Sequence, residues 1–313
     1  MDFNPSKQGL QWSPYAAAIA EHYKQWIPLY QTIPTGLTAA GQQVYVQTDS
    51  LQYDALILGA MILIETSAAA SDNGQNTFLN VYDSRNGLSW VAPGFPDAIP
   101  ATAFGGVAGQ PMPVLPLPEA YFLPAGAELI HVWNSYVAAT SGGSLTWVGV
   151  QLIDPIEGKA PECVDVDGCS IRVGGRMPWF DAIGLGLQAA SSGLPTFSLV
   201  NNIQFRGFSS AQDCDIEIHS LEANFFTVAG VSVSPDLIRL RISDTGDRRM
   251  DSLNFAPSPA VLGSYTQGTP ALPLTRPYLL KAGRKLKFDL FNTSGADLNN
   301  GYLTIRGVRR CAY

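Results

Sequence analysis

Apolar and polar residues alternate along several short segments of this chain. In residues 237–242 (LIRLRI), both arginines fall on one side and both isoleucines on the other. A period of two residues with one polar side is typical of a β-strand that buries one face. The same pattern recurs over residues 43–47, 77–82, 144–151, 203–208, 215–219, 285–291 and 302–307.

Clusters of turn-forming residues separate these segments. Gly, Asn, Asp and Ser accumulate over residues 71–74, 84–87, 244–247, 292–295 and 298–301. The chain holds 30 glycines and 22 prolines in 313 residues, which requires many turns. Short strands at this spacing favour a β-sandwich or a jelly roll.

Two segments depart from the β pattern. Residues 14–30 permit a helix up to Trp26, with Ser13 as its N-cap, Pro14 in its first turn and Pro28 limiting it. We expect this arm either to pack on its own domain or to dock on a neighbouring copy. Residues 154–194 are rich in Gly and Pro and are expected to form a long linker.

Several motifs occur twice in the same order. Leu-Pro-Leu followed by Tyr-x-Leu-x-Ala-Gly occupies residues 115–126 and 272–283, an offset of 157. Leu-Thr-x-x-Gly-Val follows at an offset of 158, and an upstream Leu-x-Val/Ile-x-Asp, ending at Asp83 and Asp244, has an offset of 161. An ordered series at nearly constant offset favours a duplicated domain. The alternative is that similar strand and turn chemistry recurs by chance.

We therefore predict a mainly β chain with two tandem β-sandwich, jelly-roll-like repeats and a short N-terminal helical arm. In each repeat, the tyrosine and leucine of the Tyr-x-Leu-x-Ala-Gly motif point inward, and its glycine allows a tight turn, so the motif is structural. The expected boundaries are an arm over residues 1–34, a first sandwich over 35–154, a linker over 155–195 and a second sandwich over 196–313.

Composition excludes several classes of protein. Hydrophobic residues make up 46% of the chain and charged residues only 14%, which argues against a coiled coil and against a charge-driven disordered chain. No run of 18 apolar residues exists, because the apolar segment 54–64 spans only eleven, and the N-terminus lacks a signal pattern. We therefore expect neither membrane insertion nor secretion. The net charge of −7 disfavours binding to nucleic acid.

The charge is distributed unevenly. Residues 1–155 contain 3 Lys/Arg and 11 Asp/Glu, whereas residues 156–313 contain 16 and 15. An acidic first half and a basic end suit head-to-tail contact between copies, or a basic rim that faces a negative surface. The alternative is an ordinary solvated strand face. The basic residues near the end are Arg276, Lys281, Arg284, Lys285, Lys287, Arg306, Arg309 and Arg310.

No cysteine or histidine motif predicts a metal site or a catalytic triad. The three histidines are far apart in sequence, and no CxxC, HExxH or Gly-x-Ser-x-Gly occurs. Without a signal peptide, reduced thiols are the expectation, and a Cys163–Cys169 disulfide across a short loop is the alternative. We predict no catalytic residue, no cofactor and no metal.

Acidic and aromatic residues offer weaker alternatives. Asp165-Val-Asp167-Gly168 resembles the start of a calcium loop, but Arg176 stands where the twelfth-position glutamate belongs, so a solvated turn is preferred. Asp215 and Glu217 share a strand face and would suit glycoside hydrolysis only by coincidence. Four tryptophans (Trp90, Trp133, Trp147 and Trp179) suit a sugar-binding platform if exposed, although core burial is the simpler interpretation.

The end of the second repeat resembles a known family. It combines an Ala-Gly turn at residues 282–283, a strand, the turn Asn292-Thr-Ser-Gly295, and a closing strand that ends in Arg306-Gly307. This pattern resembles β-sandwich structural proteins of tailed bacteriophage virions. The resemblance covers about 40 residues well and implies a head-decoration, neck or collar component, present in many symmetric copies and without catalytic residues.

These observations lead to a functional hypothesis. We expect a non-enzymatic structural component of a phage virion, made in the host cytoplasm, that forms a homo-oligomer and contacts other virion proteins such as capsid, portal or tail connector. No membrane and no specific nucleic acid are expected as partners. The alternatives are a tandem carbohydrate-binding or receptor-binding module and, third, a β-sandwich hydrolase. The expected interface residues are Tyr15, Tyr23, Trp26, Arg284, Lys285, Lys287, Arg306, Arg309 and Arg310.

Overall fold

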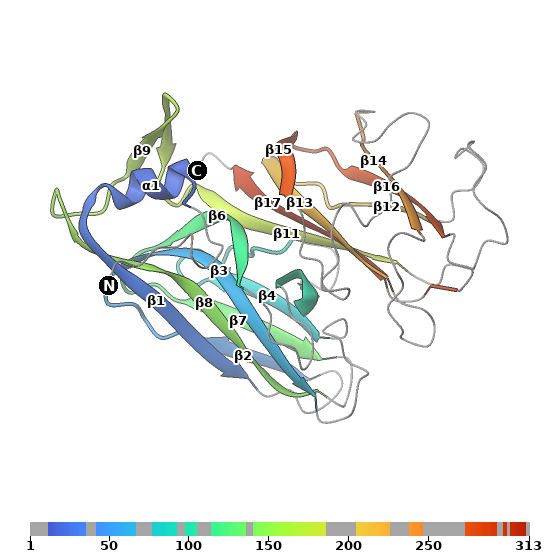
Figure 1. Ribbon diagram of the computed structural model, residues 1–313, viewed down its shortest axis with the longest axis horizontal. Helices are drawn as coiled ribbons and strands as arrows, with labels where there is room; N and C mark the ends of the chain where they lie inside the picture. Colours follow the sequence, from blue (N-terminus) through green and yellow to red (C-terminus); the bar gives the residue numbers. More distant parts are fainter. Residues whose placement is uncertain are drawn as a thin grey trace. The chain divides into compact units, whose positions relative to one another are not determined.

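The computed structural model is mainly β, as predicted, with one α-helix, α1 (Pro14–Ala20), in the part of the chain that it describes (Figure 1). It describes residues 12–35, 42–66, 77–92, 98–104, 114–135, 140–185, 205–225, 238–246, 273–292, 297–298 and 301–310. No helix within these ranges has the length and apolar character needed to cross a membrane.

The chain divides into two compact units. Unit 1 comprises Met1–Val91, Pro100–Trp179 and Val308–Tyr313, and unit 2 comprises Ala92–Ile99 and Phe180–Gly307. The boundary between the units falls inside strands β5 (Ile99–Pro100), β11 (Arg176–Leu185) and β17 (Gly301–Arg310).

The strand order of unit 1 is that of a jelly roll. One sheet has the order β1-β8-β3-β6, and the other has the order β2-β7-β4-β5. Strand β8 pairs antiparallel with β1 and β3, and β7 pairs antiparallel with β2 and β4. Two sheets of four strands in this interleaved order form the eight-stranded double Greek key. The bounds are β1 Tyr23–Thr35, β2 Gln43–Gln47, β3 Asp54–Thr66, β4 Thr77–Asp83, β6 Leu115–Leu123, β7 Leu129–Ser135 and β8 Thr140–Pro155.

Unit 2 repeats this order. Its sheets are β11-β17-β13-β15 and β12-β16-β14, so that β11, β12, β13, β14, β15, β16 and β17 take the places of β1, β2, β3, β4, β6, β7 and β8. The remaining bounds are β12 Phe205–Phe208, β13 Asp215–Asn224, β14 Ile238–Asp244, β15 Pro273–Leu280 and β16 Leu286–Asn292. The predicted tandem sandwiches are therefore confirmed as two rolls of one topology.

Individual hydrogen bonds also recur between the units. Thr48 and Leu129 exchange two hydrogen bonds of 3.0 and 2.9 Å, and Ser209 and Leu286 exchange two of 2.9 and 2.8 Å. The threonine and serine differ by 161 in number and the leucines by 157, as the sequence motifs do. Chance similarity of turns does not explain matched long-range pairs, so the duplication is a property of the fold.

The Ala-Gly turn has the predicted geometry in both units. Gly126 and Gly283 adopt φ values of 78° and 74°, a conformation that glycine tolerates best. The preceding amides of Ala125 and Ala282 donate to the carboxylates of Asp54 and Asp215, at 2.8 and 3.0 Å. The turn is thus tied to the first residue of the central strand β3 or β13.

The apolar segment 54–64 forms β3, and both of its faces are buried. Ala55, Leu56, Ile57 and Leu58 are all buried in spite of pointing alternately to opposite sides. On the outer side, Leu56 and Leu58 belong to a core cluster with residues of α1 and with Val164. A strand covered on both faces is uniformly apolar, which explains the lack of alternation here.

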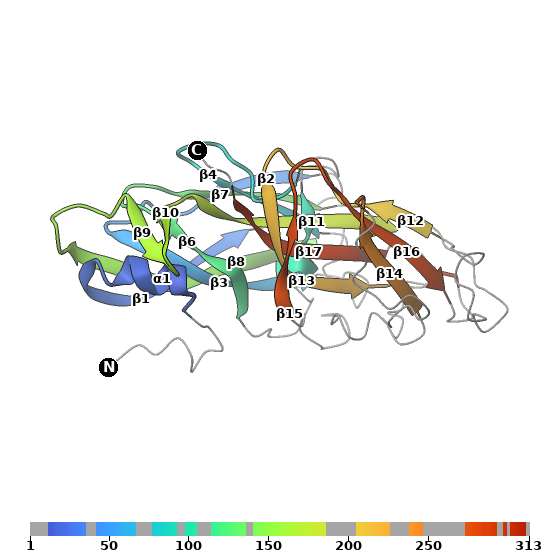
Figure 2. The ribbon, with the colours of Figure 1, turned by 90° about the horizontal axis from the view of Figure 1, so that it is seen from above.

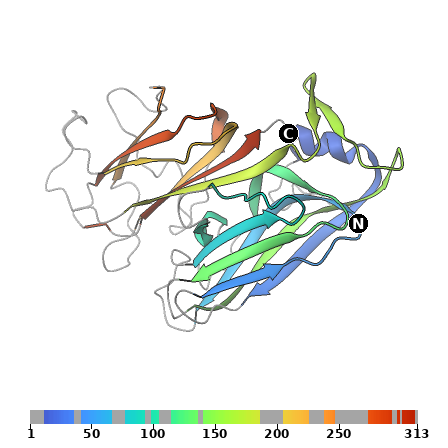
Figure 3. The same ribbon diagram turned by 180° about the vertical axis from the view of Figure 1, so that it is seen from behind.

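The predicted helix is too long. It ends at Ala20, and Tyr23–Thr35 is instead strand β1, paired with β8 along its length (Figures 1 and 3). Leu29, Ile33 and Thr35 are buried while Tyr30 and Pro34 are exposed, which is a strand pattern. Pairing with a long neighbour therefore overrides the local helix preference of residues 21–26.

The expected linker also contains strands. Residues 163–172 form a hairpin of β9 (Cys163–Val166) and β10 (Cys169–Arg172), which lies beside α1 (Figure 2). Asp167 and Gly168 have φ values of 51° and 76°, as in a two-residue type I′ turn. The preference for a solvated turn over a calcium loop agrees with this geometry.

Among the cysteines that the structure describes, Cys214 departs from the expectation of reduced thiols. Cys163 and Cys169 are free and exposed, and the hairpin register places them opposite Arg172 and Val166 rather than opposite each other. Cys214 is disulfide-bonded, so the expectation is wrong there.

Candidate interaction surfaces

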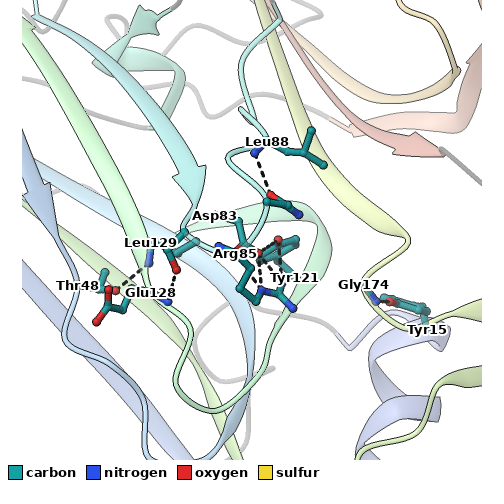
Figure 4. Close-up of polar contacts among 11 residues, drawn as sticks. Tyr15, Thr48, Asp83, Arg85, Leu88, Tyr121, Glu128, Leu129 and Gly174 are labelled. Carbon is teal, nitrogen blue, oxygen red and sulfur yellow. Dashed lines mark hydrogen bonds and ion pairs between the residues drawn. The ribbon is translucent and has the colours of Figure 1, made fainter. Parts of the chain in front are cut away.

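The tyrosines of the N-terminal arm are anchored within unit 1. Tyr15 is fully buried, and its hydroxyl accepts a hydrogen bond of 2.9 Å from the Gly174 amide (Figure 4). Burial raises the pKa of Tyr15 to about 12. The hydroxyl of Tyr23 donates to Asp54 at 2.7 Å, and burial raises the pKa of Tyr23 as well. These two side chains therefore serve the core of their own unit rather than an exposed surface.

A polar network fixes α1 on the same unit. Ser13 caps the helix by accepting a hydrogen bond of 3.1 Å from the Ala16 amide, and its hydroxyl donates to Glu119. Arg176 pairs with Glu119 at 2.8 Å and lies 5.6 Å from the centre of the Tyr15 ring. Of the two arrangements expected for the arm, the structure has the one in which it packs on its own domain.

Trp26 is the one predicted arm residue that remains accessible. It lies on β1 with 39% of its surface exposed, and its ring lies 5.5 Å from that of Trp12. Tyr30, on the same side of β1, is exposed as well. Trp26 therefore remains a proposed interface residue.

The predicted basic residues differ in how deeply they are buried. Arg306 is buried and forms an ion pair with Glu222, and Arg284 pairs with Asp244 at 3.4 Å. The others expected at the interface are less buried. Lys285 and Arg310 are exposed, and Lys287 and Arg309 are half-buried.

A buried aspartate and a tyrosine join two strands in each unit. In unit 1, Tyr121 and Arg85 both donate to the Asp83 carboxylate (Figure 4). Burial works to raise the pKa of Asp83, but the hydrogen bonds from Arg85 and Tyr121 outweigh it and hold the pKa below its ordinary value. In unit 2, Tyr278 donates to Asp244 at 2.6 Å. The repeat motifs contain both partners, but the sequence alone did not indicate that they meet.

The outer face of the sheet β12-β16-β14 carries charge in a defined arrangement. Its register places Arg206, Asp289 and Arg241 in one row across the three strands. The neighbouring row contains Phe208, Lys287 and Ser243. Arg206 pairs with Asp289 at 2.6 Å, and the side chain of Asp289 is almost fully buried.

This outer face exposes both an apolar and a basic group. Phe208 has 48% of its surface exposed, and it stands opposite Lys287 in the register. Lys285 precedes Lys287 by two residues and extends the ladder, because it exchanges two hydrogen bonds with Thr245. The sequence signal for this face is the alternation over residues 203–208, 237–242 and 285–291, which predicts three strands but not their pairing.

The four tryptophans considered for a sugar-binding platform are not exposed. Trp90, Trp133, Trp147 and Trp179 are all buried, which confirms the simpler interpretation of core burial. The indole of Trp147 donates to Nε2 of the buried His131 at 2.8 Å. Burial lowers the pKa of His131 to about 3, so the imidazole is neutral and structural.

The carboxylates considered for hydrolysis have structural contacts. Asp215 accepts the Ala282 amide and an ion pair of 2.8 Å from Lys281, in the same place where Asp54 binds Ala125. Within the described ranges, no group of three or more His, Cys, Asp or Glu side chains gathers to hold a metal ion.

Comparison with known proteins identifies no family. The sequence matches no protein-family model and no curated protein. A structure of the Sulfolobus turreted icosahedral virus aligns with 91% of this chain and 91% of its own, at 9% identity and a TM-score of 0.45. The mavirus major capsid protein aligns with 90% of this chain and 87% of its own, at 9% identity and a TM-score of 0.35.

An enzyme is also among the similar structures. A peptide-N(4)-(N-acetyl-β-D-glucosaminyl) asparagine amidase aligns with 91% of this chain and 97% of its own, at 7% identity and a TM-score of 0.31. Two of these three structures are viral, but TM-scores this low carry no argument for function.

Proposed function

We propose that this protein is a non-enzymatic structural subunit of a virus particle, which acts through self-assembly and contacts with other virion proteins. The observation that carries the proposal is the tandem pair of jelly rolls with one shared topology. Jelly rolls recur in viral capsids, in lectins and in cupins. The four tryptophans considered for a sugar platform are buried, and no cupin-like metal cluster lies among the described residues, so neither feature favours a lectin or a cupin.

The sheet edges support assembly into closed particles. In the sheets β1-β8-β3-β6 and β11-β17-β13-β15, every edge strand contains proline. The central strands β3, β13 and β17 contain none, and β8 has proline only as its last residue, Pro155. Proline on an edge lacks the amide needed to extend the ladder, so it opposes open-ended strand addition. Contacts between copies then form through side chains. The edge prolines are Pro28 and Pro34 in β1, Pro116 and Pro118 in β6, Pro178 in β11, and Pro273 and Pro277 in β15.

The narrower proposal concerns the kind of particle. The turn pattern near the C-terminal end resembles structural proteins of tailed bacteriophages, so we propose a neck, collar or head-decoration component made in the host cytoplasm. Its partners would be further copies of this chain and a capsid, portal or tail-connector protein. Mass spectrometry of purified particles, followed by their imaging, tests the location.

Light scattering of the purified full chain at several salt concentrations tests the general proposal. We expect a discrete oligomer, because a virion subunit presents surfaces that fit copies of itself. A chain that stays monomeric at every concentration, and that binds glycans on an array, would contradict the proposal and favour the carbohydrate-binding alternative.

A further inference from the structure

The outer face of the sheet β12-β16-β14 carries more basic than acidic side chains. We call its residues Arg206, Phe208, Arg241, Lys285, Lys287 and Asp289 the basic face. Four cations stand there against one carboxylate, and that carboxylate is already paired with Arg206. Within the described residues, no carboxylate lies at ion-pair distance from Lys285 or Lys287.

The centre of the basic face is suited to binding a protein. Phe208 is about half exposed and stands opposite Lys287, so an apolar side chain lies among cations. Aromatic residues and arginine are enriched at the centres of protein interfaces, where they supply apolar contact and directed hydrogen bonds. The face therefore fits a partner segment that is acidic and also presents some apolar surface.

A segment of unit 1 has the complementary chemistry. We call residues 154–172, which include the hairpin β9–β10, the acidic connector. It carries two cations, Lys159 and Arg172, against five exposed carboxylates. Ile156 is also exposed, and it supplies an apolar group beside the charges. The carboxylates are Asp154, Glu157, Glu162, Asp165 and Asp167.

A buried side chain packs the acidic connector against α1. Val164 is buried in the cluster formed with α1, while Asp165 and Asp167 next to it point to solvent. Figures 1 and 2 show the hairpin projecting from unit 1 beside α1. The hairpin is short and is fixed to unit 1 by a buried residue. Its exposed carboxylates therefore lose little conformational freedom when a partner binds.

We propose that the basic face of one copy binds the acidic connector of a second copy. The inference rests on the proposed function and adds the surfaces that would join the subunits. The contact uses different patches on the two copies, so it is heterologous and closes into a ring when the rotation between copies permits. Each copy carries a net charge of −7, so two copies repel at long range and the contact depends on local pairing of the basic face with the acidic connector.

Charge reversal in the full chain tests the contact. We expect K285E/K287E on the basic face, and E157K/D165K on the acidic connector, each to weaken self-association by about tenfold or more, since like charges then meet. The matched controls are K24E and D49K, which alter exposed charges of unit 1 outside the acidic connector. Light scattering measures the mass, and circular dichroism verifies that each variant is folded.

A variant in which both patches have reversed charge makes the test specific to this contact. A chain that carries all four substitutions is expected to regain self-association, because each patch again meets its opposite. Reversal variants that assemble as well as the controls would overturn the contact and leave the proposed function standing. A wild-type chain that never assembles would overturn both. Tight binding of single-stranded DNA, abolished by K285E/K287E while self-association is unchanged, would also overturn the contact.

Discussion

The two jelly rolls share an internal framework and differ on their surfaces. In unit 2, the outer face of β12-β16-β14 carries the row Arg206–Asp289–Arg241, and at the equivalent positions of unit 1 the row is Tyr45–Val132–Asn80. The next row is Phe208–Lys287–Ser243 in unit 2 and Gln47–Ile130–Tyr82 in unit 1. These two rows contain four charged side chains in unit 2 and none in unit 1, although the strands beneath them pair in the same register. Lys285 corresponds in number to Glu128 of unit 1, so the charge at that position has the opposite sign.

The comparison separates what holds the fold from what is free to change. The turn contacts of Asp54 and Asp215 are retained in both units because each satisfies a backbone amide that otherwise has no strand partner. Outer-face side chains satisfy no such requirement, so they diverge. The charged face of unit 2 is therefore the better place to look for a contact that only one roll makes.

The largest effect is expected at a buried ion pair that unit 2 has and unit 1 lacks. Arg306 and Glu222 form a buried ion pair, whereas the equivalent positions of unit 1 hold Val148 and Met61. We expect Arg306→Ala to destabilise unit 2 by about 3–5 kcal/mol, because the buried Glu222 loses its ion pair with Arg306. The double variant Arg306→Val/Glu222→Met copies unit 1 and should cost much less. Urea unfolding followed by circular dichroism measures both, and equal losses would contradict the account.

Both units have a glycine at which a neighbouring strand comes very close. A Cβ at Gly149 would collide with the Leu56 carbonyl, and one at Gly307 would lie 2.6 Å from the Glu217 carbonyl. We expect Gly149→Ala and Gly307→Ala each to cost about 1–3 kcal/mol, because overpacking shifts the central strands. Tryptophan fluorescence separates the units, since all six tryptophans lie in unit 1. Alanine at Gly126 would meet no atom, so any loss there reflects its positive φ alone.

The pH dependence of stability tests a group in unit 2. Asp181 is buried and accepts the Ser210 amide at 2.7 Å, and burial raises its pKa to about 6. A raised pKa means that the folded state holds the proton more tightly. Its stabilising contribution is therefore present below pH about 4 and is lost as the pH rises through about 6.

The variant Asp181→Asn checks this sign. The amide oxygen still accepts the Ser210 N–H, and no buried charge forms at neutral pH. We expect unfolding free energy to be higher by about 2 kcal/mol at pH 7 and nearly unchanged at pH 4. The measurement is the urea concentration at the midpoint of unfolding, determined for the variant and the wild type at several pH values. Parallel pH profiles would show that Asp181 does not titrate in this range.

The last comparison concerns the aspartate–tyrosine pairs. We expect Tyr121→Phe to cost about 1.5–3 kcal/mol, because Asp83 is buried and loses a charge-assisted hydrogen bond. Tyr278→Phe should cost less, since Tyr278 is only half-buried whereas Tyr121 is buried; an arginine remains beside the aspartate in both units. Equal losses, measured by fluorescence for unit 1 and circular dichroism for unit 2, would show that burial does not distinguish the pairs.

The repeat is predictable from the sequence, whereas the strands of the arm and of the linker are not. The repeat was detectable because the Ala-Gly turn and its flanking leucines recur at one offset, and local turn chemistry is written in adjacent residues. Tyr15 and Tyr23 were expected at an interface, yet both are buried within unit 1. An aromatic stripe looks the same whether a neighbouring copy or the protein's own sheet covers it.

The order of residues by itself determined the class of this protein: many short strands, glycine-rich turns and two copies of one unit. These properties depend on backbone preferences that neighbouring residues set. Only the tertiary structure decided that residues 23–35 form a strand, that Arg306 is buried against Glu222, and that Arg206, Asp289 and Arg241 share a row. Each depends on partners tens of residues away, and their pairing energy outweighs the local preference that a sequence displays.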